Sequence, residues 1–227
     1  MNLYNIIIEN GVYIIFGCSY LSLKYPLLSF YIYLKSFSAN YYFCFSKFYP
    51  NPSLYKWKHL IRLTDTGHYA NFLFYFYPEY LPISHNILFV ITFAYYITKC
   101  FFNMKDTDDR VNKQIIQSLQ IIHCEINHTF PYMIVFYHNT QSNYIFDNNT
   151  LIYSYLWVYI WLIFIWGPWI LMTGDPVYSI LDKKTPFTTK MAVVLIMHLL
   201  VYIANYSGYL INHVCNLHSE QQDLQLF

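Results

Sequence analysis

The composition of this 227-residue chain is that of a membrane protein, with 56% hydrophobic and only 11% charged residues. Soluble domains carry roughly 25% charged residues, so a soluble globular fold is excluded. The formal net charge of +1 offers no basic surface for a phosphate backbone, and we expect no nucleic-acid partner. Five scattered cysteines without a CxxC pair argue against a disulfide framework or a zinc knuckle.

Six apolar segments are long enough to cross roughly 30 Å of hydrocarbon as helices. In chain order they are 3–23, 61–81, 84–103, 115–138, 152–172 and 189–211, with a Tyr-rich seventh segment at 26–46 that is re-entrant or interfacial. Lipid offers no partners for free backbone groups, so each must be helical. We therefore predict an all-α, polytopic transmembrane helical bundle of about six spanning helices. It forms one integral membrane domain, 1–227, with a polar tail at 218–227.

The start of the chain reads as a retained helix, not a cleaved signal peptide. It has no basic region before its first apolar run, and that run carries Glu9.

Ionisable residues at membrane depth gather in two stretches, RLTDTGH at 62–68 and HCEINHTFP at 123–131. Such groups cost a few kcal/mol in a membrane and usually face the bundle interior. The polar residues of interest are Thr64, Asp65, His68, Gln117, Gln120, His123, Glu125, Asn127 and His128.

Helical spacing places the second group on neighbouring stripes. Gln120, Cys124 and His128 recur every four residues and share a face, while His123 and Asn127 form the adjacent stripe. Pro131 lacks an N–H and frees a carbonyl near Asn127. The pattern fits an internal site, and it equally fits a hydrogen-bonded seam between helices.

The spacing of the histidines argues against a metal. His123 and His128 are five residues apart, about 140° around a helix, so they cannot share a zinc ion. Axial haem ligands usually come from different helices, which leaves His85, His128 and His198 as candidates. No small residues recur beside them to admit a macrocycle, and we expect no metal or cofactor.

A more specific interpretation of the same residues is nucleophilic catalysis. A Thr hydroxyl becomes a nucleophile when a base removes its proton, and His is the usual base near neutral pH. Thr64 and His128 lie at membrane depth on separate predicted helices, while His68 is four residues from Thr64. Thr66 and His123 compete for the two roles.

A family resemblance rests on the block TGDPVYSILDKKTP at 173–186. It resembles the TG-x-x-VY-x-x-L-x-x-x-x-P pattern of the androgen-induced (FAR-like) family of integral membrane hydrolases. The stretch NHTFP at 127–131 is similar to that family's Asn-His stretch ending in Pro, and Trp57-Lys58 and Leu63-Thr64 are similar to its earlier motifs. The resemblance covers roughly residues 57–213.

The resemblance implies a hydrolase of fatty acid esters of hydroxy fatty acids, with Thr64 as nucleophile and His128 as its base. Asp65, His68, Gln120, His123, Glu125 and Asn127 would be supporting polar residues. Membrane lipids would be both environment and substrate, in the endomembrane system or the plasma membrane.

Two other classes stay open. The abundance of Tyr (26) and Phe (19), with Arg only at 62 and 110, is typical of an AT-rich genome. It motivates a non-catalytic transmembrane subunit of a mitochondrial respiratory-chain or ATP-synthase complex, in the inner membrane. A proton path or transporter through Asp65, Glu125 and His128 lacks the sequence symmetry that such proteins usually carry.

Overall fold

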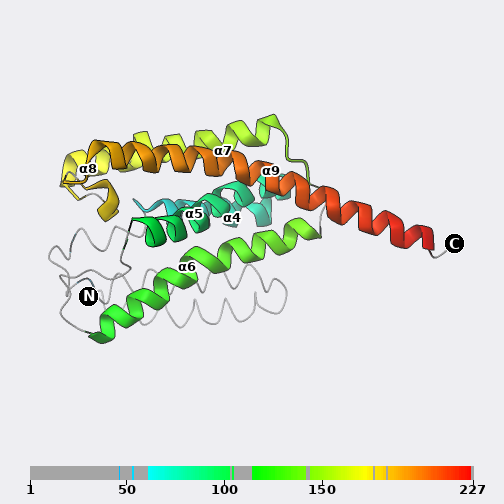
Figure 1. Ribbon diagram of the computed structural model, residues 1–227, viewed down its shortest axis with the longest axis horizontal. Helices are drawn as coiled ribbons and strands as arrows, with labels where there is room; N and C mark the ends of the chain where they lie inside the picture. Colours follow the sequence, from blue (N-terminus) through cyan, green and yellow to red (C-terminus); the bar gives the residue numbers. More distant parts are fainter. Residues whose placement is uncertain are drawn as a thin grey trace, which may run out of the picture.

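The computed structural model describes residues 46, 53, 61–102, 104, 114–141, 144–175, 177–182 and 184–225 (Figure 1). Every regular element in these ranges is helical, which confirms the all-α prediction for this part of the chain. In order, the elements are α4 (Leu63–Phe76), η2 (Pro78–Tyr80), α5 (Leu81–Phe101), α6 (Gln114–Thr140), α7 (Asn148–Ile160), η3 (Trp161–Trp166), α8 (Gly167–Thr173), η4 (Ser179–Leu181) and α9 (Phe187–Gln225).

Among the described residues, three helices are long and apolar enough to cross a membrane. They are Pro78–Phe101, Asn148–Thr173 and Phe187–Cys215, and they coincide with the spans expected at 84–103, 152–172 and 189–211. The segments 3–23 and 26–46 lie outside the described residues, apart from Ser46.

The other two expected spans are helical but do not qualify as spanning helices. At 61–81, α4 has only 14 residues and ends before Tyr77, whose backbone is not helical. At 115–138, α6 has 27 residues, but its polar residues keep it out of the spanning set. The structure therefore supports three spans in the described residues, where the sequence predicted about six over the whole chain. The expected polar tail continues α9 as helix to Gln225.

The α5 helix is the centre of the bundle and packs against α4, α6, α7 and α9. Figure 1 shows α6 on one side of α5 and the paired α7 and α9 on the other. Gly67 of α4 allows a close approach, because a Cβ there would lie 2.2 Å from Ile91 Cδ1 of α5. This approach holds the start of α4 against the core.

A π-helical segment, η3, interrupts the second span before Pro168. Proline has no N–H for the ladder, and a π turn is a common local adjustment at such a point. Trp161, at the start of η3, is 2% exposed, and its indole Nε1 donates to the Ile61 carbonyl at 2.7 Å. The π segment is thereby tied to the entrance of α4.

A buried polar seam joins α5, α7 and α9 away from the residues singled out in sequence. Asn86 Nδ2 donates to Ser154 Oγ at 3.0 Å and to Asn205 Oδ1 at 2.9 Å. Side-chain hydrogen bonds of this kind hold helices together where lipid provides no hydrophobic driving force. A hydrogen-bonded seam, one of the two interpretations of the polar pattern on α6, thus also occurs between α5, α7 and α9.

Candidate active site

Thr64 and His128 meet between α4 and α6, 64 residues apart in the chain. Thr64 Oγ1 lies 3.1 Å from His128 Nε2, within hydrogen-bond range. Thr64 is 5% exposed and sits in the first turn of α4, where the helix dipole favours negative charge. A nucleophile and a base in contact are the first requirement for acyl transfer.

The contact made by His128 Nδ1 determines whether Nε2 can accept a hydrogen bond from Thr64. His128 Nδ1 lies 2.6 Å from the Cys124 carbonyl oxygen, which can only accept a hydrogen bond. Nδ1 must therefore carry a proton, and in the tautomer with its proton on Nδ1 the Nε2 atom is the acceptor for the Thr64 hydroxyl. Thr92 Oγ1 also donates to the His128 carbonyl, which fixes this turn of α6 against α5.

Tyr95 holds the other face of the His128 ring. The two rings are stacked, with centroids 4.0 Å apart and planes 8° from parallel. The Tyr95 hydroxyl donates to Glu125 Oε1 at 3.2 Å and accepts from Lys99 Nζ at 3.2 Å. Glu125 is paired with Lys99 at 2.5 Å, and it supports the site through Tyr95 without touching Thr64.

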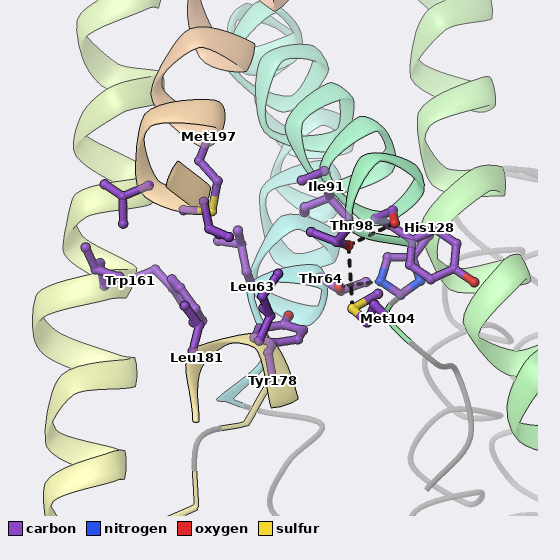
Figure 2. A pocket seen from close by; sticks show the side chains of 16 residues that line it. Leu63, Thr64, Ile91, Thr98, Met104, His128, Trp161, Tyr178, Leu181 and Met197 are labelled. Atoms are coloured by element: carbon purple, nitrogen blue, oxygen red, sulfur yellow. Dashed lines mark hydrogen bonds between the residues drawn. The ribbon is translucent and has the colours of Figure 1, made fainter. Parts of the chain in front are cut away.

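An apolar cavity of about 80 Å³ opens beside the Thr64–His128 pair (Figure 2). Its wall comes from α4, α5, α6, η3, η4 and α9. The lining residues are Leu63, Thr64, Ile91, Ala94, Tyr95, Thr98, Met104, His128, Trp161, Leu162, Tyr178, Ile180, Leu181, Val193, Val194 and Met197. Two reactive groups at the edge of an apolar chamber match a ligand with one polar centre and a long apolar part.

Residues 177–181, which follow α8, complete this cavity. Gly174 ends α8 with φ +71°, and Asp175 Oδ1 accepts a hydrogen bond from the Val177 N–H at 3.1 Å. Val177 is buried with φ +63°, a strained conformation for a β-branched residue. Such strain is kept where surrounding structure requires it, and here the next residue, Tyr178, lines the cavity.

The Tyr178 phenol lies beside Thr64 at the floor of the cavity (Figure 2). Burial raises the pKa of Tyr178, although nearby Arg62 and hydrogen-bonding contact with Thr64 act in the opposite direction. The phenol therefore stays protonated near neutral pH and remains a hydrogen-bond donor.

A second polar group lies next to the pair and includes most of the remaining candidates. Asp65, His68, His123 and Asn127 are all buried, at 4% exposure or less. Asn127 Nδ2 lies 2.9 Å from His123 Nδ1, which confirms the expected contact between these two positions.

His68 contacts this group through a backbone carbonyl of α6 that a proline leaves without a helical hydrogen bond. Its Nε2 lies 3.1 Å from the Asn127 carbonyl oxygen. This is the carbonyl that Pro131, inside α6, leaves without a helical N–H partner, as the sequence predicted.

The competing candidates have other partners. Thr66 Oγ1 donates to the Leu63 carbonyl at 2.7 Å, the usual backbone bond of a helical threonine. His123 contacts Asn127, and Gln120 is buried but does not line either cavity beside Thr64.

The histidines considered as haem ligands lie in different settings. His85 is buried against Asn86 and Tyr132, whereas His198 is exposed on α9 beside Tyr155 and Tyr159. Over the described ranges, no group of three or more His, Cys, Asp or Glu is placed to hold a metal ion.

Sequence reasoning missed Tyr95, Tyr178 and Trp161. Tyr95 carried no local signal, because its partner is on another helix. Tyr178 lies in the TG/VY block, so its motif was noted without a role for the side chain. No protein family, curated protein or solved structure matches this chain.

Proposed function

We propose that this chain is a membrane-embedded hydrolase of long-chain lipid esters, with Thr64 as nucleophile and His128 as general base. The observation that carries the proposal is the 3.1 Å contact of Thr64 Oγ1 with a His128 ring whose Nδ1 lies 2.6 Å from the Cys124 carbonyl. The apolar cavity beside this pair supports a substrate with a long acyl chain. The likeness of the TG/VY block to the androgen-induced family is part of the proposal.

Acylation would begin when His128 Nε2 takes the proton of Thr64 Oγ1 as the oxygen attacks the ester carbonyl carbon. The tetrahedral intermediate then collapses, the carbon–oxygen bond to the alcohol breaks, and His128 returns its proton to the leaving alkoxide. The products of this half-reaction are a free alcohol and an acyl-Thr64 ester.

Charge on the tetrahedral oxygen would be stabilised by groups already at the site. The first turn of α4 presents its positive end at Thr64, and the neutral Tyr178 phenol contacts the same residue. Donors fixed before the reaction are often the largest contribution to such catalysis.

The wall of the cavity suggests where the substrate comes from. Val193, Val194 and Met197 of α9 and Trp161 and Leu162 of η3 bound it, and both elements belong to helices apolar enough to span a membrane. A lipid ester already in the bilayer therefore fits this location better than a water-soluble ester.

The test is ester hydrolysis by the full chain purified in lipid nanodiscs, using p-nitrophenyl esters of increasing acyl length. We expect Thr64→Ala and His128→Ala to lower kcat/KM by about 10³-fold or more, with Thr64 labelled by a fluorophosphonate probe in the wild type only. Activity should rise with chain length until the cavity is filled.

Two control variants replace a threonine and a histidine outside the proposed pair. The threonine lies on the same helix as Thr64. Thr66→Ala removes a neighbouring hydroxyl that donates to the backbone carbonyl of Leu63, and His198→Ala removes an exposed histidine. Both should keep near-normal activity. Unchanged hydrolysis in Thr64→Ala would refute the proposal. A wild type without hydrolysis that copurifies stoichiometrically with respiratory or ATP-synthase subunits would instead support the non-catalytic class.

A further inference from the structure

A second, smaller cavity borders the Thr64–His128 pair. It shares only these two residues with the apolar cavity, and the rest of its lining is Arg62, Asp65, His123, Cys124 and Asn127. The reacting pair therefore separates an apolar chamber from a polar one. Such a division is informative, because hydrolysis requires an apolar substrate and water at the same atoms.

The size of this polar cavity corresponds to one water molecule. Its volume is about 10 Å³, near the minimum of roughly 10–15 Å³ that accommodates a single buried water. A buried water also needs two to four polar partners, and the side chains of Asp65, His123 and Asn127 supply them. The apolar chamber lacks such partners over most of its lining, and apolar cavities stay dry.

Asn127 carries the most specific evidence. The residue is 4% exposed, and its Nδ2 is used by the His123 ring at 2.9 Å and the His123 carbonyl at 2.8 Å. Its Oδ1 is buried and has no hydrogen-bond partner among the described residues. A buried acceptor without a partner destabilises the folded chain, so a ligand that donates a hydrogen bond is expected there.

We propose that this cavity binds the water molecule that hydrolyses the acyl-Thr64 ester, oriented by Asn127 and activated by His128. The inference rests on the proposed function, because it concerns the second half of that reaction. It adds a binding site for water. The apolar cavity binds the substrate for acylation, and the polar cavity binds the water for deacylation.

The deacylation step balances with the groups in place. The water oxygen attacks the acyl carbonyl carbon while His128 Nε2 takes one water proton. The bond between that carbon and Thr64 Oγ1 then breaks, and His128 returns the proton to Oγ1. The products are a carboxylic acid and the free Thr64 hydroxyl, with His128 neutral as at the start.

Two substitutions test the cavity from different sides. Asn127→Leu removes the unmatched acceptor and places methyl groups in the space, whereas Cys124→Val fills it without changing any of the polar partners. A chromogenic p-nitrophenyl ester separates the two half-reactions, because the first turnover reports acylation and the steady state reports deacylation. Intact mass measures the fraction of chain carrying an acyl group.

For both variants we expect the first-turnover rate to stay within about twofold of wild type while steady-state turnover falls by at least about tenfold. The acyl-Thr64 form should then accumulate. A normal first turnover also shows that the site has folded. Ile91→Phe, which narrows the apolar chamber, should give the opposite pattern, with slow acylation and little accumulated ester.

Three results would overturn the water site: no change in either phase, an equal fall in both, or loss of acylation in both variants. Failure of the proposed function is a separate result, because the wild type would then form no acyl-Thr64 ester at all. Incorporation of ¹⁸O from labelled water into the released acid confirms that water, not a second alcohol, is the acceptor.

Discussion

At the scale of single residues, the site depends on how the His128 ring is held. Its edge is fixed by Cys124 and Thr64, and its face is covered by Tyr95. Tyr95 is itself anchored through its hydroxyl to Glu125 and Lys99. The partly exposed pair of Lys99 and Glu125 thereby anchors a ring that contacts the proposed base, although neither charge touches Thr64.

Substitution of Tyr95 should slow catalysis in proportion to the contact removed. Tyr95→Leu loses the stacked ring, which is worth about 0.5–1.5 kcal/mol, so we expect kcat/KM to fall by about threefold to tenfold. Tyr95→Phe keeps the ring and loses only the hydroxyl, so its loss should be smaller. Tyr96→Phe is the control. It removes another hydroxyl that donates to Glu125, at 2.9 Å from Oε2, but leaves the ring stacked on His128 unchanged. Equal activity in all three variants would show that the stack does not position His128.

At the scale of helices, local periodicity in the sequence predicted the contacts between residues on the same helix. Four-residue spacing predicted the contact of His123 with Asn127, and Pro131 predicted the freed carbonyl that His68 now contacts. Spacing also marked Thr64 and His128 as polar positions, but their contact depends on how α4 and α6 pack. The close approach of Gly67 to α5, against which α6 also packs, is likewise not revealed by any pattern within α4.

The residues that were missed have partners distant in sequence. Trp161 reaches the Ile61 carbonyl 100 residues away, and Asn86 reaches Asn205 across 119 residues. The helix at 61–81 is shorter than the expected span for a related reason. Buried helices of a bundle resemble spanning helices in composition, and α4 is short and mostly buried.

The N-terminus of α7 offers a prediction about stability. Asp147 caps this helix, accepting from the Thr150 N–H at 2.8 Å. That backbone hydrogen bond lowers the pKa of Asp147 because it favours the charged carboxylate. A lowered folded-state pKa contributes stability that is fully present above the unfolded pKa of about 4 and is lost as the pH falls through the folded value.

We therefore expect Asp147→Ala to lower the Tm of the detergent-solubilised chain at pH 7, with a smaller difference below about pH 4. Asp147→Asn keeps an acceptor and should lose less stability, without the same dependence on pH. Asn148→Ala, at an exposed neighbouring position, serves as the control. A constant difference in Tm from pH 7 to pH 3 would contradict the role assigned to the charged cap.

At the scale of the whole molecule, burial separates the core helix from the helices with exposed apolar surfaces. The most apolar stretch of Pro78–Phe101 is 72% buried, whereas that of Asn148–Thr173 is 11% buried. Leu171 and Met172 are 86% and 85% exposed. Large continuous apolar surfaces of this kind are not kept in water. This difference in burial makes α5 the protein core, and the exposed apolar surface of α7 to α9 is compatible with contact with hydrocarbon.

The relative direction of α5 and α9 follows from the residues around the apolar cavity. Met104, just after α5, and Tyr178, between α8 and α9, both line it, so α5 ends at the end of the bundle where α9 begins. The 29-residue span Phe187–Cys215 is about 43 Å long at 1.5 Å per residue, enough to reach the opposite side. Figure 1 shows the C-terminal end of α9 extending away from the rest of the bundle.

Cys100 and Cys215 should therefore react with a membrane-impermeant maleimide from opposite sides of sealed vesicles. Cys100 is exposed near the end of α5 and Cys215 is partly exposed at the far end of the last span, while the buried Cys124 should react only after denaturation. Mass spectrometry of peptides identifies each labelled thiol, and Cys100→Ser checks the assignment. Detergent permeabilisation should make both thiols reactive together. Labelling of both from the same side of intact vesicles would mean that α5 and α9 do not cross the membrane antiparallel, and the cavity could not lie between them as described.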